Sequence, residues 1–117
     1  MEQLMHHKKE ERPWGHFERF THNEQTTVKL ITVHAGEAFS LQTHEHRDEF
    51  WQIVRGGGTV QVGEQKKEAA RGDSFFIPRH TLHRATGGSD GMTILEIAFG
   101  TFDEDDIKRI EDKYGRA

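Results

Sequence analysis

The residues best suited to chemistry lie in the stretch SLQTHEHRDEFW, at positions 40–51. Side chains two apart on an extended strand share a face, so Gln42, His44 and His46 would point the same way. Glu49 has the opposite parity, and a bend or strand change must bring it onto that face. A solvated pair of histidines on an exposed strand is the alternative interpretation of this pattern.

A second group of residues lies far downstream, in GDSFFIPRHTLHR, where His83 shortly follows a predicted strand that ends at Pro78. If this strand neighbours the first one in a small barrel, four side chains can converge inside it: Gln42, His44, Glu49 and His83. Imidazole, carboxylate and amide groups together suit one divalent ion such as Zn, Co, Ni, Mn or Fe. Four protein ligands would leave coordination positions open for water or substrate.

Short strands are predicted along most of the chain. Turn signals recur about every 8–12 residues, and the runs between them are rich in Val, Ile, Phe and Thr, which favours an all-β sandwich or barrel over βαβ units. Residues 103–113 begin with acidic side chains and place Ile107 and Ile110 three apart, which predicts a short C-terminal helix. We expect a single domain over residues 1–117, with residues 1–10 flexible.

The composition excludes several classes of partner. A chain of 117 residues with a net charge of −4 has no basic field for nucleic acid, and its charges are interleaved rather than gathered into a membrane-binding stripe. The absence of cysteine rules out disulfides and thiolate metal sites. With no apolar leader in its first residues, the chain is expected to be soluble and cytoplasmic.

Two spaced motifs resemble those of the cupins. The first contains Gln where the usual first histidine stands, and the second contains a proline and a histidine. The spacing of the first motif selects His44 rather than His46 as the ligand, because His44 lies five residues before Glu49 and His46 only three. The resemblance implies a small double-stranded β-helix, or jelly-roll barrel. The motif residues are Gly36, Gln42, His44, Glu49 and Gly56, then Gly72, Pro78 and His83.

A narrower resemblance covers about residues 11–116. The segments RPWG, FFIPRHTLHR, ILEIAFG and EDDIKRIEDKYGR, in this order, look like the C-terminal cupin domain of type II phosphomannose isomerases. It implies metal-dependent conversion of mannose 6-phosphate to fructose 6-phosphate through an enediol(ate), in polysaccharide biosynthesis, by a homodimer. No segment resembles that family's GxGxRL nucleotide loop, so guanylyltransferase activity is not expected. Gly87 stands where the cupin motif commonly has an Asn.

This reaction needs a base and cations for a phosphate. Glu96 is the first candidate base, with Lys29 as its partner, and His46 is the second. Lys29, Arg84 and Arg109 are the candidate phosphate contacts. Lys29 could instead mark a protected sheet edge, and Arg109 could pair with acidic neighbours on its helix.

Two other functions compete with this one. The chain could be a non-catalytic cupin that binds a sugar phosphate or nucleotide sugar, or a metal-dependent cupin oxygenase. Whatever the function, Glu45, Arg47 and Asp48 are expected in a turn or on the surface, and Trp51 and Phe75 in the core.

Overall fold

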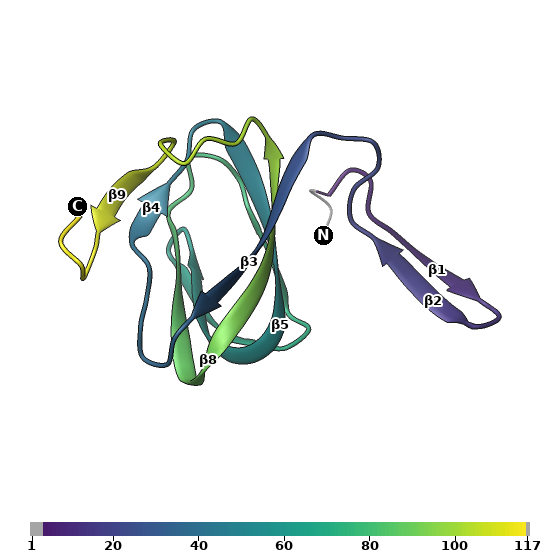
Figure 1. Cartoon of the computed structure of the whole chain (residues 1–117), viewed down its shortest axis with the longest axis horizontal. Coiled ribbons are helices and arrows are strands. Elements are labelled where there is room, and N and C mark those ends of the chain that lie inside the picture. Colours follow the sequence, from purple (N-terminus) through teal and green to yellow (C-terminus); the bar gives the residue numbers. More distant parts are fainter. Residues whose placement is uncertain (1–3, 117) are drawn as a thin grey trace.

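The computed structural model describes residues 4–116, which form a β-barrel with one projecting hairpin (Figure 1). No helix occurs among these residues, and therefore none that could cross a membrane. The strands are β1 (Lys8–Arg12), β2 (Gly15–Arg19), β3 (Thr26–Val33), β4 (Leu41–Thr43), β5 (Arg47–Val62), β6 (Gln65–Ala70), β7 (Ser74–Ile77), β8 (His83–Gly100) and β9 (Lys108–Glu111).

Two long strands, β5 and β8, organise the barrel. They pair antiparallel along most of their length, and the other barrel strands flank them in the order β6-β5-β8-β4-β9, with β3 beside β8 and β7 beside β5. The β5–β8 register shifts between Ile53 and Arg55 and again between Gly56 and Gly58. Such bulges bend a strand, so each long strand can serve both halves of the barrel.

Alternation along the strands fills the barrel interior. On β5 every second side chain faces inward, so that Trp51 and Ile53 enter the apolar core. The buried residues of this core are Val33, Trp51, Ile53, Val60, Ala69, Ile77, Ala85, Met92 and Ile94. A smaller cluster of Leu4, Phe50 and Ile97, joined by Phe20, Phe76 and Phe99, packs the N-terminal segment against the barrel.

The all-β fold is confirmed, but the predicted helix at residues 103–113 is wrong. Residues 108–111 form β9 instead, which pairs antiparallel with β4, with Thr43 opposite Lys108 and Leu41 opposite Glu111. Ile107 and Ile110 supply too little apolar surface for a short helix, and Ile110 remains exposed. The free edge of β4 satisfies the backbone of this segment better.

Part of the N-terminal segment that we expected to be flexible is packed and paired. Leu4 is buried, and residues 8–10 belong to β1. Residues 1–3 lie outside the described part of the chain.

Candidate metal centre

Three predicted ligands meet in the barrel interior. One ligand atom from each of His44, Glu49 and His83 lies within 4.8 Å of the others, and all three side chains are buried. The Nε2 atom of His44 is 3.5 Å from Oε2 of Glu49, and Nε2 of His83 is 3.6 Å from Oε1. His44 directly follows β4, Glu49 lies on β5 and His83 begins β8, so only the closed barrel brings them together.

Both imidazoles are oriented by backbone carbonyls. Nδ1 of His44 lies 2.5 Å from the carbonyl oxygen of Asp106, and Nδ1 of His83 lies 2.9 Å from that of Thr81. With Nδ1 donating, each Nε2 lone pair is directed at the cluster. Nε2 of His83 is buried with no hydrogen-bond partner. Metal-bound histidines are commonly oriented by such hydrogen bonds. A buried nitrogen without a hydrogen-bond partner is consistent with a site that binds an ion.

The electrostatics place all three groups in the protonation state that a metal requires. Burial lowers the pKa of both His44 and His83, which keeps the rings neutral. For Glu49, burial acts to raise the pKa, but attraction to His83 and His44 in their protonated forms and the hydrogen bond and charge of Arg47 outweigh it, so the pKa lies below its usual value. When both rings are neutral, Arg47 is the cation that keeps Glu49 ionised. Two neutral imidazoles and a carboxylate are a suitable ligand set for a divalent ion, so this cluster could hold one.

Gln42, the fourth predicted ligand, lies at the edge of the cluster. Its Nε2 is 3.4 Å from Nε2 of His44, and its Oε1 accepts a hydrogen bond of 2.7 Å from Ser40. A metal would need the amide oxygen, so Gln42 could become a ligand only if its amide turned over. In this structure Gln42 therefore lines the cluster with its nitrogen.

Arg47 is a site residue that the sequence interpretation missed. We expected it in a turn or on the surface, but its side chain is buried in the cluster. Its Nε donates to Oε2 of Glu49 at 2.9 Å, and its Nη2 lies 3.2 Å from Nε2 of His44. The guanidinium also packs over the ring of Phe102, with its Cζ 4.4 Å from the ring centroid. Its parity was the available signal, since Arg47, Glu49 and Trp51 alternate along one strand face.

Glu96 and Lys29 lie beside the cluster. Trp51 Nε1 bridges the two carboxylates, with Oε1 of Glu49 at 3.2 Å and Oε2 of Glu96 at 3.1 Å. Lys29 Nζ is 3.8 Å from Oε1 of Glu96 and 3.7 Å from the exposed carboxylate of Glu104. Burial and the nearby charge of Glu49 raise the pKa of Glu96 to about 7.

Among the described residues, none of the other predicted site residues forms a hydrogen bond or ion pair with His44, Glu49 or His83. His46 is exposed, and its backbone N–H donates to the carboxylate of Asp106. Arg84 follows His83 on β8, and its guanidinium donates hydrogen bonds to the carbonyl of Phe39 and to Glu111. Arg109, on β9, is the register partner of Gln42, and its buried Nε has no hydrogen-bond partner.

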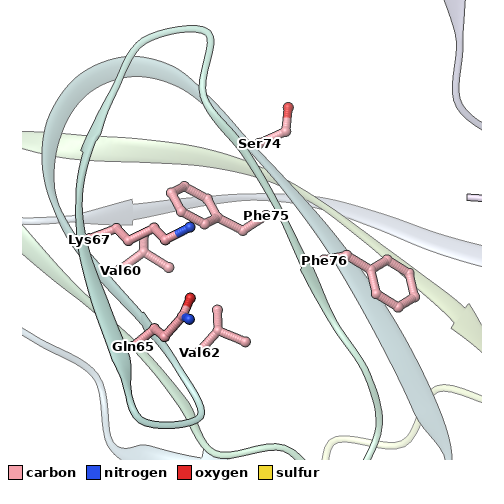
Figure 2. A pocket seen from close by; sticks show the side chains of 7 residues that line it. All are labelled: Val60, Val62, Gln65, Lys67, Ser74, Phe75 and Phe76. Carbon is pink, nitrogen blue, oxygen red and sulfur yellow. The ribbon is translucent and has the colours of Figure 1, made fainter. Parts of the chain in front are cut away.

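A separate pocket lies between β7 and the β5–β6 hairpin (Figure 2). Its walls mix apolar and polar side chains, and Lys67 is the charged residue among those that line it. It is lined by Val60, Val62, Gln65, Lys67, Ser74, Phe75 and Phe76, and it contains none of the cluster residues.

The barrel has the double-stranded β-helix fold of the cupins, as its similarity to two solved structures shows. KdgF from Halomonas sp. matches with a TM-score of 0.65 and 21% identity, over 74% of this chain and 78% of that one. A cupin protein from Bacteroides fragilis matches with a TM-score of 0.59 and 22% identity, over 65% and 66%. Residues 1–112 match the family described as "Mannose-6-phosphate isomerase C-terminal", and the chain belongs to that family.

The curated relatives correct the expected activity. ManC of Salmonella typhimurium is 36% identical over 94% of this chain, and a Klebsiella pneumoniae protein is 40% identical over 94%. Both are named as mannose-1-phosphate guanylyltransferases. The prediction of a mannose-6-phosphate isomerase is therefore wrong, as is the exclusion of guanylyltransferase activity. This chain spans 23% and 24% of the lengths of these two relatives.

Proposed function

We propose that this chain is a metal-binding cupin domain that binds a mannose phosphate and serves guanylyl transfer to mannose 1-phosphate. The observation that carries the proposal is the meeting of His44, Glu49 and His83 with both Nε2 atoms directed inward. The mannose phosphate is proposed as the ligand because the relatives are named as mannose-1-phosphate guanylyltransferases.

Zinc is the metal that this ligand set favours, because two imidazoles and one carboxylate are a common three-ligand zinc set. Co, Ni, Mn and Fe also accept such ligands. When bound, the ion would supply a Lewis acid for a sugar or phosphate oxygen. His44, Glu49 and His83 would hold it, with Gln42 as a fourth ligand after its amide turns over.

The charges around the cluster suit an anionic sugar. Lys29 and Arg47 both pack against the ring of Phe102, at 4.9 Å and 4.4 Å from its centroid. Arg47 contacts Glu49 and His44, and Lys29 lies beside Glu96. A phosphate could replace the carboxylate of Glu104 beside Lys29. Glu96 would accept a hydrogen bond from a sugar hydroxyl when ionised, or donate one when protonated.

Calorimetric titration of the zinc-loaded chain tests this function. Mannose 1-phosphate and mannose 6-phosphate are each titrated in, with free mannose as the control for the phosphate. We expect binding of at least one mannose phosphate, weakening at least tenfold after chelation and in Lys29→Met. The proposal would be contradicted by equal binding of free mannose, or by no binding of either phosphate to a folded, metal-loaded chain.

A further inference from the structure

The segment between β8 and β9 runs across one end of the barrel (Figure 1). It contains a tight turn over residues 103–106, closed by a hydrogen bond of 3.0 Å from the N–H of Asp106 to the carbonyl of Asp103. The N–H of Asp105 also donates to the carboxylate of Asp103, at 2.9 Å. Aspartate side chains stabilise turns by such bonds to the backbone two residues further on. The turn therefore has a defined shape although it belongs to no strand.

One residue of this turn, Asp106, contacts three consecutive residues of the metal centre and its surroundings. Its carbonyl oxygen lies 2.5 Å from Nδ1 of His44. Its carboxylate accepts hydrogen bonds from the backbone N–H groups of Glu45 at 2.9 Å and His46 at 3.0 Å, one on each oxygen. Hydrogen bonds to a charged acceptor are roughly twice as strong as neutral ones. Asp106 thus holds both the ring of His44 and the backbone next to it.

Residues 44–46 form the whole connection between β4 and β5. Outside the strands, no ladder of hydrogen bonds fixes this backbone, so its N–H groups need other acceptors. The carbonyl of His44 accepts from the N–H of His80 at 2.7 Å, which fixes the start of the connection. The carboxylate of Asp106 fixes the rest. Without this carboxylate, Glu45 and His46 would bond to water, and the backbone that carries His44 would gain freedom.

The same turn supports a second ligand through Arg47. Nη1 of Arg47 donates to the carbonyl of Asp103 at 3.1 Å, and its Nε donates to Oε2 of Glu49 at 2.9 Å. One turn therefore contacts the ring of His44 directly and the carboxylate of Glu49 through a guanidinium. Its placement against the 44–46 connection affects the geometry of both ligands.

We infer that Asp106 is a positioning residue of the metal centre. Its carboxylate fixes the 44–46 connection against the 103–106 turn, and so keeps Nε2 of His44 directed at the cluster. The inference rests on the proposed metal binding and extends it to a residue that ligates no metal itself. Loss of the groups that orient metal ligands commonly weakens metal binding about 10–100-fold, so removal of this carboxylate should act in that range.

Zinc affinity measured by competition with a chromophoric chelator tests the inference. Asp106→Ala should bind zinc about 10–100-fold more weakly than the wild type. Asp105→Ala is the matched control, because Asp105 is exposed in the same turn and its carboxylate forms no hydrogen bond or ion pair within residues 4–116. Its zinc affinity should equal that of the wild type. Asp106→Asn keeps one acceptor oxygen for the two N–H groups, so its affinity should lie between those of Asp106→Ala and the wild type.

The visible absorption of the cobalt-loaded chain gives a second measurement, since the bands of bound Co²⁺ depend on the arrangement of its ligands. Asp105→Ala should give the wild-type spectrum. Fully loaded Asp106→Ala should give a different one, because the ring of His44 is no longer held in one orientation. A residue that only stabilised the fold would lower the melting temperature of the metal-free chain and leave the spectrum of the folded, loaded chain unchanged.

Either wild-type zinc affinity or an unchanged cobalt spectrum in folded Asp106→Ala would overturn the inference, as would equal weakening in Asp105→Ala. If Asp106→Ala does not fold, Asp106→Asn carries the test, and wild-type affinity in that variant would also overturn it. A folded wild type that binds neither zinc nor cobalt would instead contradict the proposed metal binding itself, and the role of Asp106 with it.

Discussion

Nε2 of His83 lies 3.6 Å from Oε1 of Glu49 in the barrel interior and has no hydrogen-bond partner. The two residues are 34 positions apart in the sequence (83 − 49 = 34), at the start of β8 and near the start of β5. Their approach depends on the whole barrel, since β5 and β8 run antiparallel. Binding at this cluster should therefore be coupled to folding, as in other metal sites.

The metal-free protein should lose stability in mild acid. Burial lowers the pKa of His44 and His83 below 6.5, so below that pH the unfolded chain takes up protons that the folded chain resists. Their stabilising contribution is fully present above 6.5 and is lost as the pH falls towards the folded-state values. Urea unfolding of the chelated protein on both sides of pH 6.5 measures this. In the double variant His44→Gln/His83→Gln the free energy of unfolding should depend less on pH. If wild type and variant lost stability equally between these pH values, the two histidines would not be its cause.

Arg47→Met should destabilise the metal-free protein strongly. The substitution leaves buried Glu49 without the guanidinium that bonds it at 2.9 Å, and breaking a buried pair costs about 3–5 kcal/mol. Metal binding should tighten, because a cation next to the ligands has been removed. Melting temperatures with and without zinc test both effects. Arg79→Met is the control, since its ion pair with Asp48 is exposed and contributes only about 0–1 kcal/mol. Equal losses in the two variants would refute a buried role for Arg47.

Glu96→Gln should stabilise the metal-free protein at neutral pH relative to the wild type. The pKa of Glu96 is raised from 4.5 to about 7, so between these values the unfolded chain releases a proton that the folded chain keeps. The contribution of this carboxyl to the stability of the wild type is therefore lost as the pH rises from 4.5 towards 7. The difference in free energy of unfolding between variant and wild type should grow from pH 4.5 to 7, and the Gln oxygen can still accept from Trp51. Glu104→Gln, at an exposed partner of Lys29, should show no such trend.

Gly58→Ala should disrupt the pairing of the long strands. A Cβ at Gly58 would lie 2.0 Å from the carbonyl oxygen of Thr86, in backbone that cannot move without separating β5 from β8. Overpacking of this kind costs about 1–3 kcal/mol or more. At Gly36 no atom lies within 4 Å of such a Cβ, and only its φ of +73° opposes the change, at about 1–2 kcal/mol. Thermal unfolding should show the larger loss for Gly58→Ala, and the reverse order would be inconsistent with this packing.

The predicted ligands could be placed in one cluster from the sequence because motif spacing is a local property, although strand parity alone set Glu49 apart from His44. His44, Glu49 and His83 fall on motif positions, and the barrel brings them together. Arg47 was missed because a charged side chain beside Asp48 is typical of a turn, whereas here its parity turns it inward beside Glu49. The orientation of the Gln42 amide depends on Ser40, and no pattern of residue types predicts that hydrogen bond.

The C-terminal segment shows why local patterns fail at edges. Residues 103–113 have a helix-like charge distribution, but β4 offers them a free backbone edge that only the tertiary structure provides. The segment then supplies the Asp106 carbonyl that orients His44, a contact between residues 62 positions apart. Part of the candidate metal centre therefore comes from the segment whose structure was predicted wrongly.

The metal content of the purified chain tests the central claim most directly. After chelation and reconstitution with zinc, elemental analysis should give one zinc per wild-type chain and per His46→Gln chain, because His46 is exposed. His83→Gln and Glu49→Gln should bind much less than one, with circular dichroism showing that both remain folded. A folded His83→Gln chain that still holds one tightly bound zinc would contradict the metal centre described for this barrel.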